Sequence, residues 1–101
     1  MEATTPEIRV AIPPALRPLC EGEAPSRRAE LYFAARDVRE LLAELGRRHP
    51  RVHGMLCDER GEPRPHINVF VNVDHVRARA GLDTPLTSGD LVTILPAVSG
   101  G

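Results

Sequence analysis

The chain has 101 residues, of which 42% are hydrophobic and 27% are charged, as in an ordinary soluble globular domain with a single core. Its formal net charge of −1 excludes a global basic field that would recruit nucleic acid, and its three aromatic residues do not form a stacking platform for single strands. No stretch reaches the roughly 20 apolar residues of a membrane span, and the start MEATTPEIRV lacks the apolar segment of a signal peptide, so we expect a cytoplasmic protein.

Two segments with alternating apolar residues open the chain. Residues 7–12 alternate with period two, which predicts a strand that ends at Pro13. A loop follows, in which we expect Leu16 and Leu19 to contact the core. Residues 29–33 alternate again, so the two segments predict a β-hairpin with a long loop. The residues expected to face the core are Ile8, Val10, Ile12, Ala29, Leu31 and Phe33.

The next segment predicts the main helix. Asp37 is a suitable N-cap, and Glu40 three residues later completes a capping-box pattern. Pro50 ends the helix, after a last turn in which positive charge suits the helix dipole. A brief second helix is expected over 51–57. The apolar face is Val38, Leu41, Leu42 and Leu45, and the basic last turn is Arg47, Arg48 and His49.

Two more strands are predicted in the second half of the chain. Residues 66–73 alternate strictly, and we expect the two flanking histidines, His66 and His75, on the surface. A turn at 88–90 leads into the last strand, 91–95. The residues expected to face the core are Ile67, Val69, Val71 and Val73 in the first of these strands, and Val92 and Ile94 in the second.

The element order is strand, strand, helix, strand, strand, which indicates the α+β class. If the first and last strands pair at the centre, they run parallel, and the right-handed crossover places the helix on one face. This is the β-grasp, or ubiquitin-like, fold, with a mixed sheet of about four to five strands and one main helix across one face. We expect one domain over 1–101, with 1–6 and 98–101 as flexible ends.

The side chains give little basis for catalysis. His49 and His53 are four residues apart, but Pro50 interrupts the helix between them and no further ligand is placed to complete a metal site. Cys20 and Cys57 are not in a CxxC pattern and are expected to be free, mostly buried thiols. There is no glycine-rich phosphate loop and no nucleophile with a base, so we expect a protein that is not an enzyme.

The helix-free face of the sheet is the candidate interaction surface. Phe70 lies on the strand face opposite the core valines, and Leu95 points away from Val92 and Ile94. An apolar patch there would suit partner docking, although single exposed hydrophobic residues are also normal.

Residues 69–101, VFVNVDHVRARAGLDTPLTSGDLVTILPAVSGG, resemble the C-terminal third of MoaD/ThiS-type sulfur carrier proteins. The shared pattern is a VxVN strand, a turn, a tPL…GD linker, an apolar strand and a P-x-V-x-G-G end. The phrases GLDTPL and VTILPAV, with RPL after the first strand, make the chain similar to the CysO-like branch, which carries sulfur for cysteine synthesis. It departs from the family at Val73 and Asp74, where a glycine is common in the turn.

The resemblance implies a specific chemistry. An E1-like adenylyltransferase/sulfurtransferase would adenylate the Gly101 carboxylate with ATP and Mg²⁺, and a sulfur donor would convert it to a thiocarboxylate. The chain itself would bind no cofactor. A cysteine-synthase-like enzyme dependent on O-phosphoserine would use the sulfur, and a metalloprotease would release the product. The residues implied in partner binding are Gly100 in a narrow tunnel, Ser99 and Val98 at its mouth, and Leu95 and Phe70 in the docking patch.

Other functions fit the same pattern. The sulfur could serve molybdopterin, thiamin, tRNA thiolation or a specialised metabolite. The chain could also be a ubiquitin-like modifier conjugated through Gly101; it has no lysine, which rules out lysine-linked self-chains. A third class is an interaction domain whose terminal SGG has no role.

Overall fold

A computed structural model of the protein describes residues 4–20 and 29–97. None of the described helices is long and apolar enough to cross a membrane. The predicted order of strands and helices is confirmed, including the short second helix; β4 and the 3-10 segments (η) are additional. The elements are β1 (Glu7–Ala11), η1 (Pro14–Leu19), β2 (Glu30–Ala34), α1 (Val38–Arg48), α2 (Pro50–Leu56), β3 (Ile67–Val71), β4 (Asp74–His75), η2 (Val76–Ala78), η3 (Gly81–Asp83) and β5 (Leu91–Pro96).

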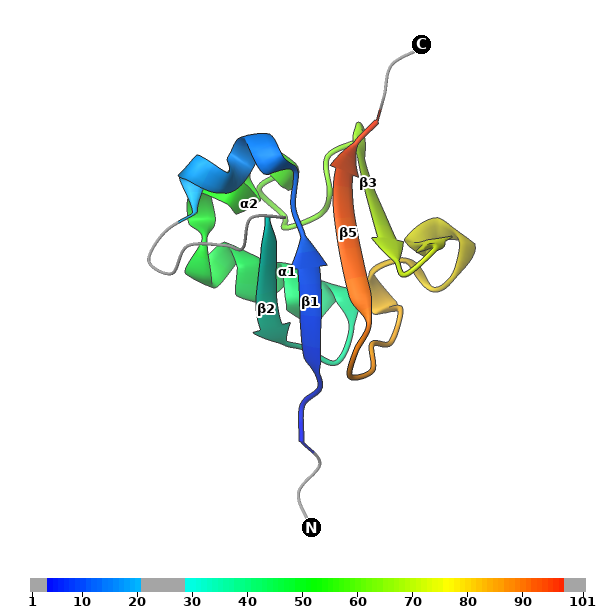
Figure 1. Cartoon of the computed structure of the whole chain (residues 1–101). Helices are drawn as coiled ribbons and strands as arrows, with labels where there is room; N and C mark the ends of the chain where they lie inside the picture. Colours follow the sequence, from blue (N-terminus) through cyan, green and yellow to red (C-terminus); the bar gives the residue numbers. More distant parts are fainter. Residues whose placement is uncertain (1–3, 21–28, 98–101) are drawn as a thin grey trace.

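The strands form one mixed sheet in the order β2-β1-β5-β3-β4. The hairpin of β1 and β2 is antiparallel, β1 and β5 are parallel at the centre, and β5 is antiparallel to β3. Figure 1 shows α1 and α2 behind the sheet, so helices cover one face, and no helix among the described residues covers the other. The predicted β-grasp architecture is therefore confirmed.

Helix α1 packs its apolar stripe on the sheet, and its start is capped as predicted. Asp37 Oδ1 accepts a hydrogen bond from the Glu40 N–H at 2.7 Å. The return bond of the capping box goes one residue further back, because Glu40 Oε1 accepts from the Arg36 N–H at 2.9 Å. The four apolar residues expected on the inner face, Val38, Leu41, Leu42 and Leu45, are all buried.

The end of α1 differs from the prediction at one residue. His49 was expected in the last helical turn, but it is the C-cap, where its N–H donates to the Leu45 carbonyl at 2.7 Å. Pro50 then starts α2 rather than only ending α1. The His49 ring is buried, 3% exposed, with its centroid 6.0 Å from that of Phe33.

The prediction that Val73 faces the core is wrong. Strand β3 ends at Val71, and Asn72 adopts a left-handed conformation with φ of 56°, a geometry that asparagine tolerates better than most residues. The chain therefore turns back, Val71 pairs with Asp74, and Val73 lies 89% exposed at the tip. His75, expected on the surface, is half-buried in the returning strand β4, and Val76 after it joins the core.

The linker between η2 and β5 is held by two polar side chains. Thr84 is fully buried; its hydroxyl donates to the Gly81 carbonyl at 2.7 Å and accepts from the Ala80 N–H at 3.2 Å. Asp90 accepts from the Thr87 N–H at 2.9 Å and from the Asn72 side-chain amide at 3.1 Å. The latter bond ties the linker to the β3–β4 turn. The Thr84 and Asp90 side chains of the tPL…GD pattern thus hold the linker in position before β5.

We predict that the stability contributed by Asp90 depends on pH. Partial burial opposes ionisation, but the hydrogen bonds from Thr87 and Asn72 outweigh it and lower the pKa of Asp90 below its usual value. A lowered folded-state pKa gives stability that is present above the unfolded value, about 3.9, and is lost as pH falls through the folded value. Urea unfolding of wild type and Asp90→Asn should therefore differ most at neutral pH and converge on acidification; a constant difference would contradict this.

Candidate functional site

The last strand runs through the centre of the sheet and is paired on both sides. Pairing with β3 continues to the end of the strand, where Pro96 lies opposite Ile67. One residue further, the Ala97 N–H donates to the His66 carbonyl at 2.6 Å. The four predicted tail residues, Val98, Ser99, Gly100 and Gly101, lie outside the described residues. The last described residue, Ala97, is therefore still hydrogen-bonded to the segment that leads into β3.

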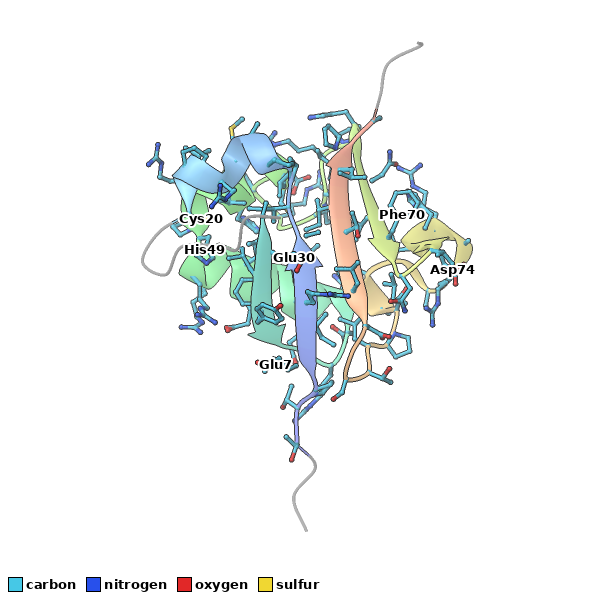
Figure 2. All side chains as sticks on the ribbon, viewed as in Figure 1. Glu7, Cys20, Glu30, His49, Phe70 and Asp74 are labelled. Atoms are coloured by element: carbon cyan, nitrogen blue, oxygen red, sulfur yellow. The ribbon has the colours of Figure 1, made fainter. Side chains whose placement is uncertain are left out.

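The open face carries the two predicted docking residues. Val69 and Ile94 pair across β3 and β5 and are buried, so their neighbours in sequence lie on the opposite face. Phe70 lies opposite Thr93 there and is half-buried, and Leu95 lies opposite Asn68 and is 42% exposed. We call the side chains of Asn68, Phe70, Thr93 and Leu95 the open-face patch. In Figure 2, Phe70 lies by β3, on the opposite flank from Cys20 and His49.

His75 holds this patch in place, a role that the sequence analysis missed. Its ring packs edge-on against Phe70, with centroids 5.2 Å apart and planes at 74°. Its Nδ1 accepts from the Arg77 N–H at 3.0 Å, which leaves the proton on Nε2. Nε2 therefore donates to Asn68 Oδ1, 3.0 Å away. Recognising the two-residue turn at Asn72 would have placed His75 beside Phe70.

The thiols are not activated. Burial raises the pKa of Cys57 to about 11, with a smaller contribution from Asp58. Burial also raises the pKa of Cys20, against the opposing charge of Arg17. Both cysteines are free, as expected, and both are disfavoured as thiolates at neutral pH. Within residues 4–20 and 29–97, no group of three or more His, Cys, Asp or Glu side chains could hold a metal ion.

Comparison with known proteins settles the family. The sequence model of the ThiS family matches residues 23–101, more than half of the chain. The chain belongs to the ThiS family. The sulfur carrier protein CysO of Mycobacterium tuberculosis is 31% identical over 96 residues, which cover 93% of this chain and 98% of that protein. The resemblance of the C-terminal third to this group is thereby confirmed.

Solved structures of similar proteins share the fold of this ThiS-family chain. The crystal structure of a BexX/CysO complex from Amycolatopsis orientalis contains a chain that matches with a TM-score of 0.75 and 34% identity, over 93% of this chain and 99% of that one. The solution structure of small archaeal modifier protein 1 from Methanosarcina acetivorans matches with a TM-score of 0.73 and 28% identity, over 95% and 97% of the two chains. One relative is thus named as a sulfur carrier and another as a modifier.

Proposed function

We propose that this protein is a cytoplasmic sulfur carrier, a single domain over residues 1–101 that is acted on by partner enzymes and is not itself an enzyme. Membership of the ThiS family supports this, together with the similarity to CysO over nearly the whole chain. The observation that carries the proposal is the central strand β5, which pairs with β1 over Leu91–Thr93 and on the β3 side up to Ala97, with the family match continuing to Gly101. Such a strand is a rigid base for a short reactive tail.

The reacting group in this proposal is the main-chain carboxylate of Gly101. One carboxylate oxygen attacks the α-phosphate of ATP, held with Mg²⁺ by an E1-like partner, and pyrophosphate leaves. Hydrosulfide, or an equivalent sulfur donor, then attacks the acyl carbon and AMP leaves, which gives a thiocarboxylate. Gly100 and Gly101 have no Cβ and would pass through a narrow tunnel, with Ser99 and Val98 at its mouth. The protein itself would bind no cofactor.

The open-face patch would dock partners. Phe70 and Leu95 offer apolar surface on the face that none of the described helices covers, and His75 fixes the position of the Phe70 ring. The most specific version of the proposal gives the sulfur to a cysteine-synthase-like enzyme, with a metalloprotease that releases the cysteine adduct from Gly101. Molybdopterin, thiamin, tRNA thiolation and specialised metabolites are the other destinations for the same sulfur.

The test is intact-mass spectrometry of the protein after incubation with the adenylating enzyme of the same organism, ATP, Mg²⁺ and sulfide. We expect one carboxylate oxygen to be replaced by sulfur, in an ATP-dependent reaction. Adding an O-phosphoserine-dependent synthase should then give a cysteine adduct at Gly101. No change in mass with an adenylating enzyme that loads its other carriers would contradict the proposal.

A second function is favoured by the similarity to small archaeal modifier protein 1. If the protein is a modifier, the adenylated Gly101 would form an amide with lysines of other proteins. This predicts high-mass adducts that resist reductant and require an intact Gly-Gly end. Their absence from cells in which the thiocarboxylate forms would favour the carrier alone.

A further inference from the structure

An apolar groove lies at the end of the sheet where β5 finishes. Figure 1 shows η1, α2 and the tip of β5 at this same end of the molecule. The groove has a volume of about 190 Å³. One wall is Ala15 and Leu16 of η1, and the other includes Met55 of α2 and Pro96 of β5. We call it the tail-exit groove.

The tail-exit groove is built to receive an apolar group. Of the eight described residues that line it, seven are apolar, and the eighth is His66. A cavity of about 150 Å³ is enough for a benzene-sized molecule, so this groove admits one large apolar side chain. Met55 is 54% exposed on its wall, and Ala15 is exposed on the other. Exposed methionine is a common component of surfaces that adapt to a partner.

The length of the tail places the adenylating enzyme close to this groove; this step rests on the proposed function. Four residues follow Ala97 up to Gly101, and an extended chain covers at most about 3.6 Å per residue. If Gly101 reacts inside an adenylating enzyme, the mouth of that active site lies within about 14 Å of Ala97. Pro96, adjacent to Ala97 in sequence, lines the tail-exit groove. The rim of the enzyme tunnel therefore lies within reach of the groove.

We propose that the tail-exit groove receives one large apolar side chain from the rim of the adenylating enzyme's tunnel. The contact aligns the tail with the tunnel from the side of η1 and α2, whereas the open-face patch lies on the other face of the sheet. It also gives a role to the PPALRPL segment, because residues of η1 form one wall of the groove. Specificity for the partner then depends on two separate surfaces around the tail.

The experiment compares three variants with wild type in the thiocarboxylation assay, at varied carrier concentration. Met55→Glu and Ala15→Glu each place a charge in the groove from an opposite wall. Val73→Glu is the matched control, since Val73 is 89% exposed at the β3–β4 turn, away from the tail. Circular dichroism melts of all three establish that they are folded.

We expect Met55→Glu and Ala15→Glu to raise the KM for the carrier by about tenfold, the effect of losing one central apolar contact. The kcat at saturating carrier should stay within about twofold, because the reacting group is untouched, and Val73→Glu should match wild type in both. Equal KM values for folded Met55→Glu and Val73→Glu would overturn the groove proposal. If wild type itself is never thiocarboxylated, the proposed function fails instead. A change of oligomeric state in light scattering for both Met55→Glu and Ala15→Glu, but not for Val73→Glu, would assign the groove to a second copy of this chain and also overturn the proposal.

Discussion

Deletion of Gly101 is expected to lower the rate of thiocarboxylate formation by at least about 100-fold. Removing one residue withdraws the terminal carboxylate by about 3.3–3.6 Å, and a misplacement of only 1 Å at a reacting centre is enough to cost about 100-fold. The tail is counted from Ala97, which is held to His66 by a 2.6 Å hydrogen bond at the end of the sheet, so each deleted residue shortens the reach from a fixed point. Single-turnover assays followed by intact-mass spectrometry would measure the loss.

A second deletion distinguishes the effect of tail length from the effect of the identity of the last residues. Deleting Ser99 shortens the tail by the same one residue but keeps a Gly-Gly end. If tail length is decisive, both deletion variants should lose activity to a similar extent. Both variants should still compete with wild type for the adenylating enzyme, because the open-face patch and the tail-exit groove are intact. Thiocarboxylation of the Gly101 deletion at the wild-type rate would contradict the assignment of the reacting group.

Much of the fold could be predicted because each element carries its own local signal. The alternation in β1, β3 and β5 and the capped apolar stripe of α1 are periodic over five or more residues, and each defines its buried face. The parallel direction of β1 and β5 was expected on the condition that the first and last strands are neighbours at the centre of the sheet, and the structure meets that condition. The exact end of β3 did not follow, because a run of alternating apolar residues continues through Val73 while Asn72 already turns the chain.

The candidate site was harder to predict because it is assembled from distant segments. Phe70 and Leu95 could be assigned to one face by alternation alone, but the His75 contact depends on the turn between β3 and β4. The tail-exit groove brings together η1, α2 and the end of β5. A periodic pattern of apolar residues describes one element at a time, so it does not show that these three lie together. The role of the Gly-Gly end could be inferred only from a family resemblance, since two glycines have no side chain that would indicate a chemical role.

Phe33→Ala should give the largest loss of stability of any substitution considered for this protein. Phe33 is 2% exposed, and its ring contacts the His49 ring and lies 5.2 Å from the Arg48 guanidinium carbon, in cation–π range. Truncating a buried phenylalanine removes apolar burial and leaves a cavity, at a cost of about 3–5 kcal/mol. Against a total of about 5–15 kcal/mol for a small domain, this is a large fraction of the free energy of unfolding.

The loss should be graded with side-chain size, which tests the packing argument even if the alanine variant fails to fold. Phe33→Leu keeps most of the apolar volume but loses the ring that Arg48 and His49 face, so we expect a smaller decrease in urea-unfolding free energy than for alanine. Tyr32, the neighbouring residue on the open side of β2, is 52% exposed, and Tyr32→Leu is the matched control with little expected effect. A loss for Phe33→Ala below about 1 kcal/mol would mean that the core between β2 and the end of α1 collapses to fill the space, which would contradict the packing argument.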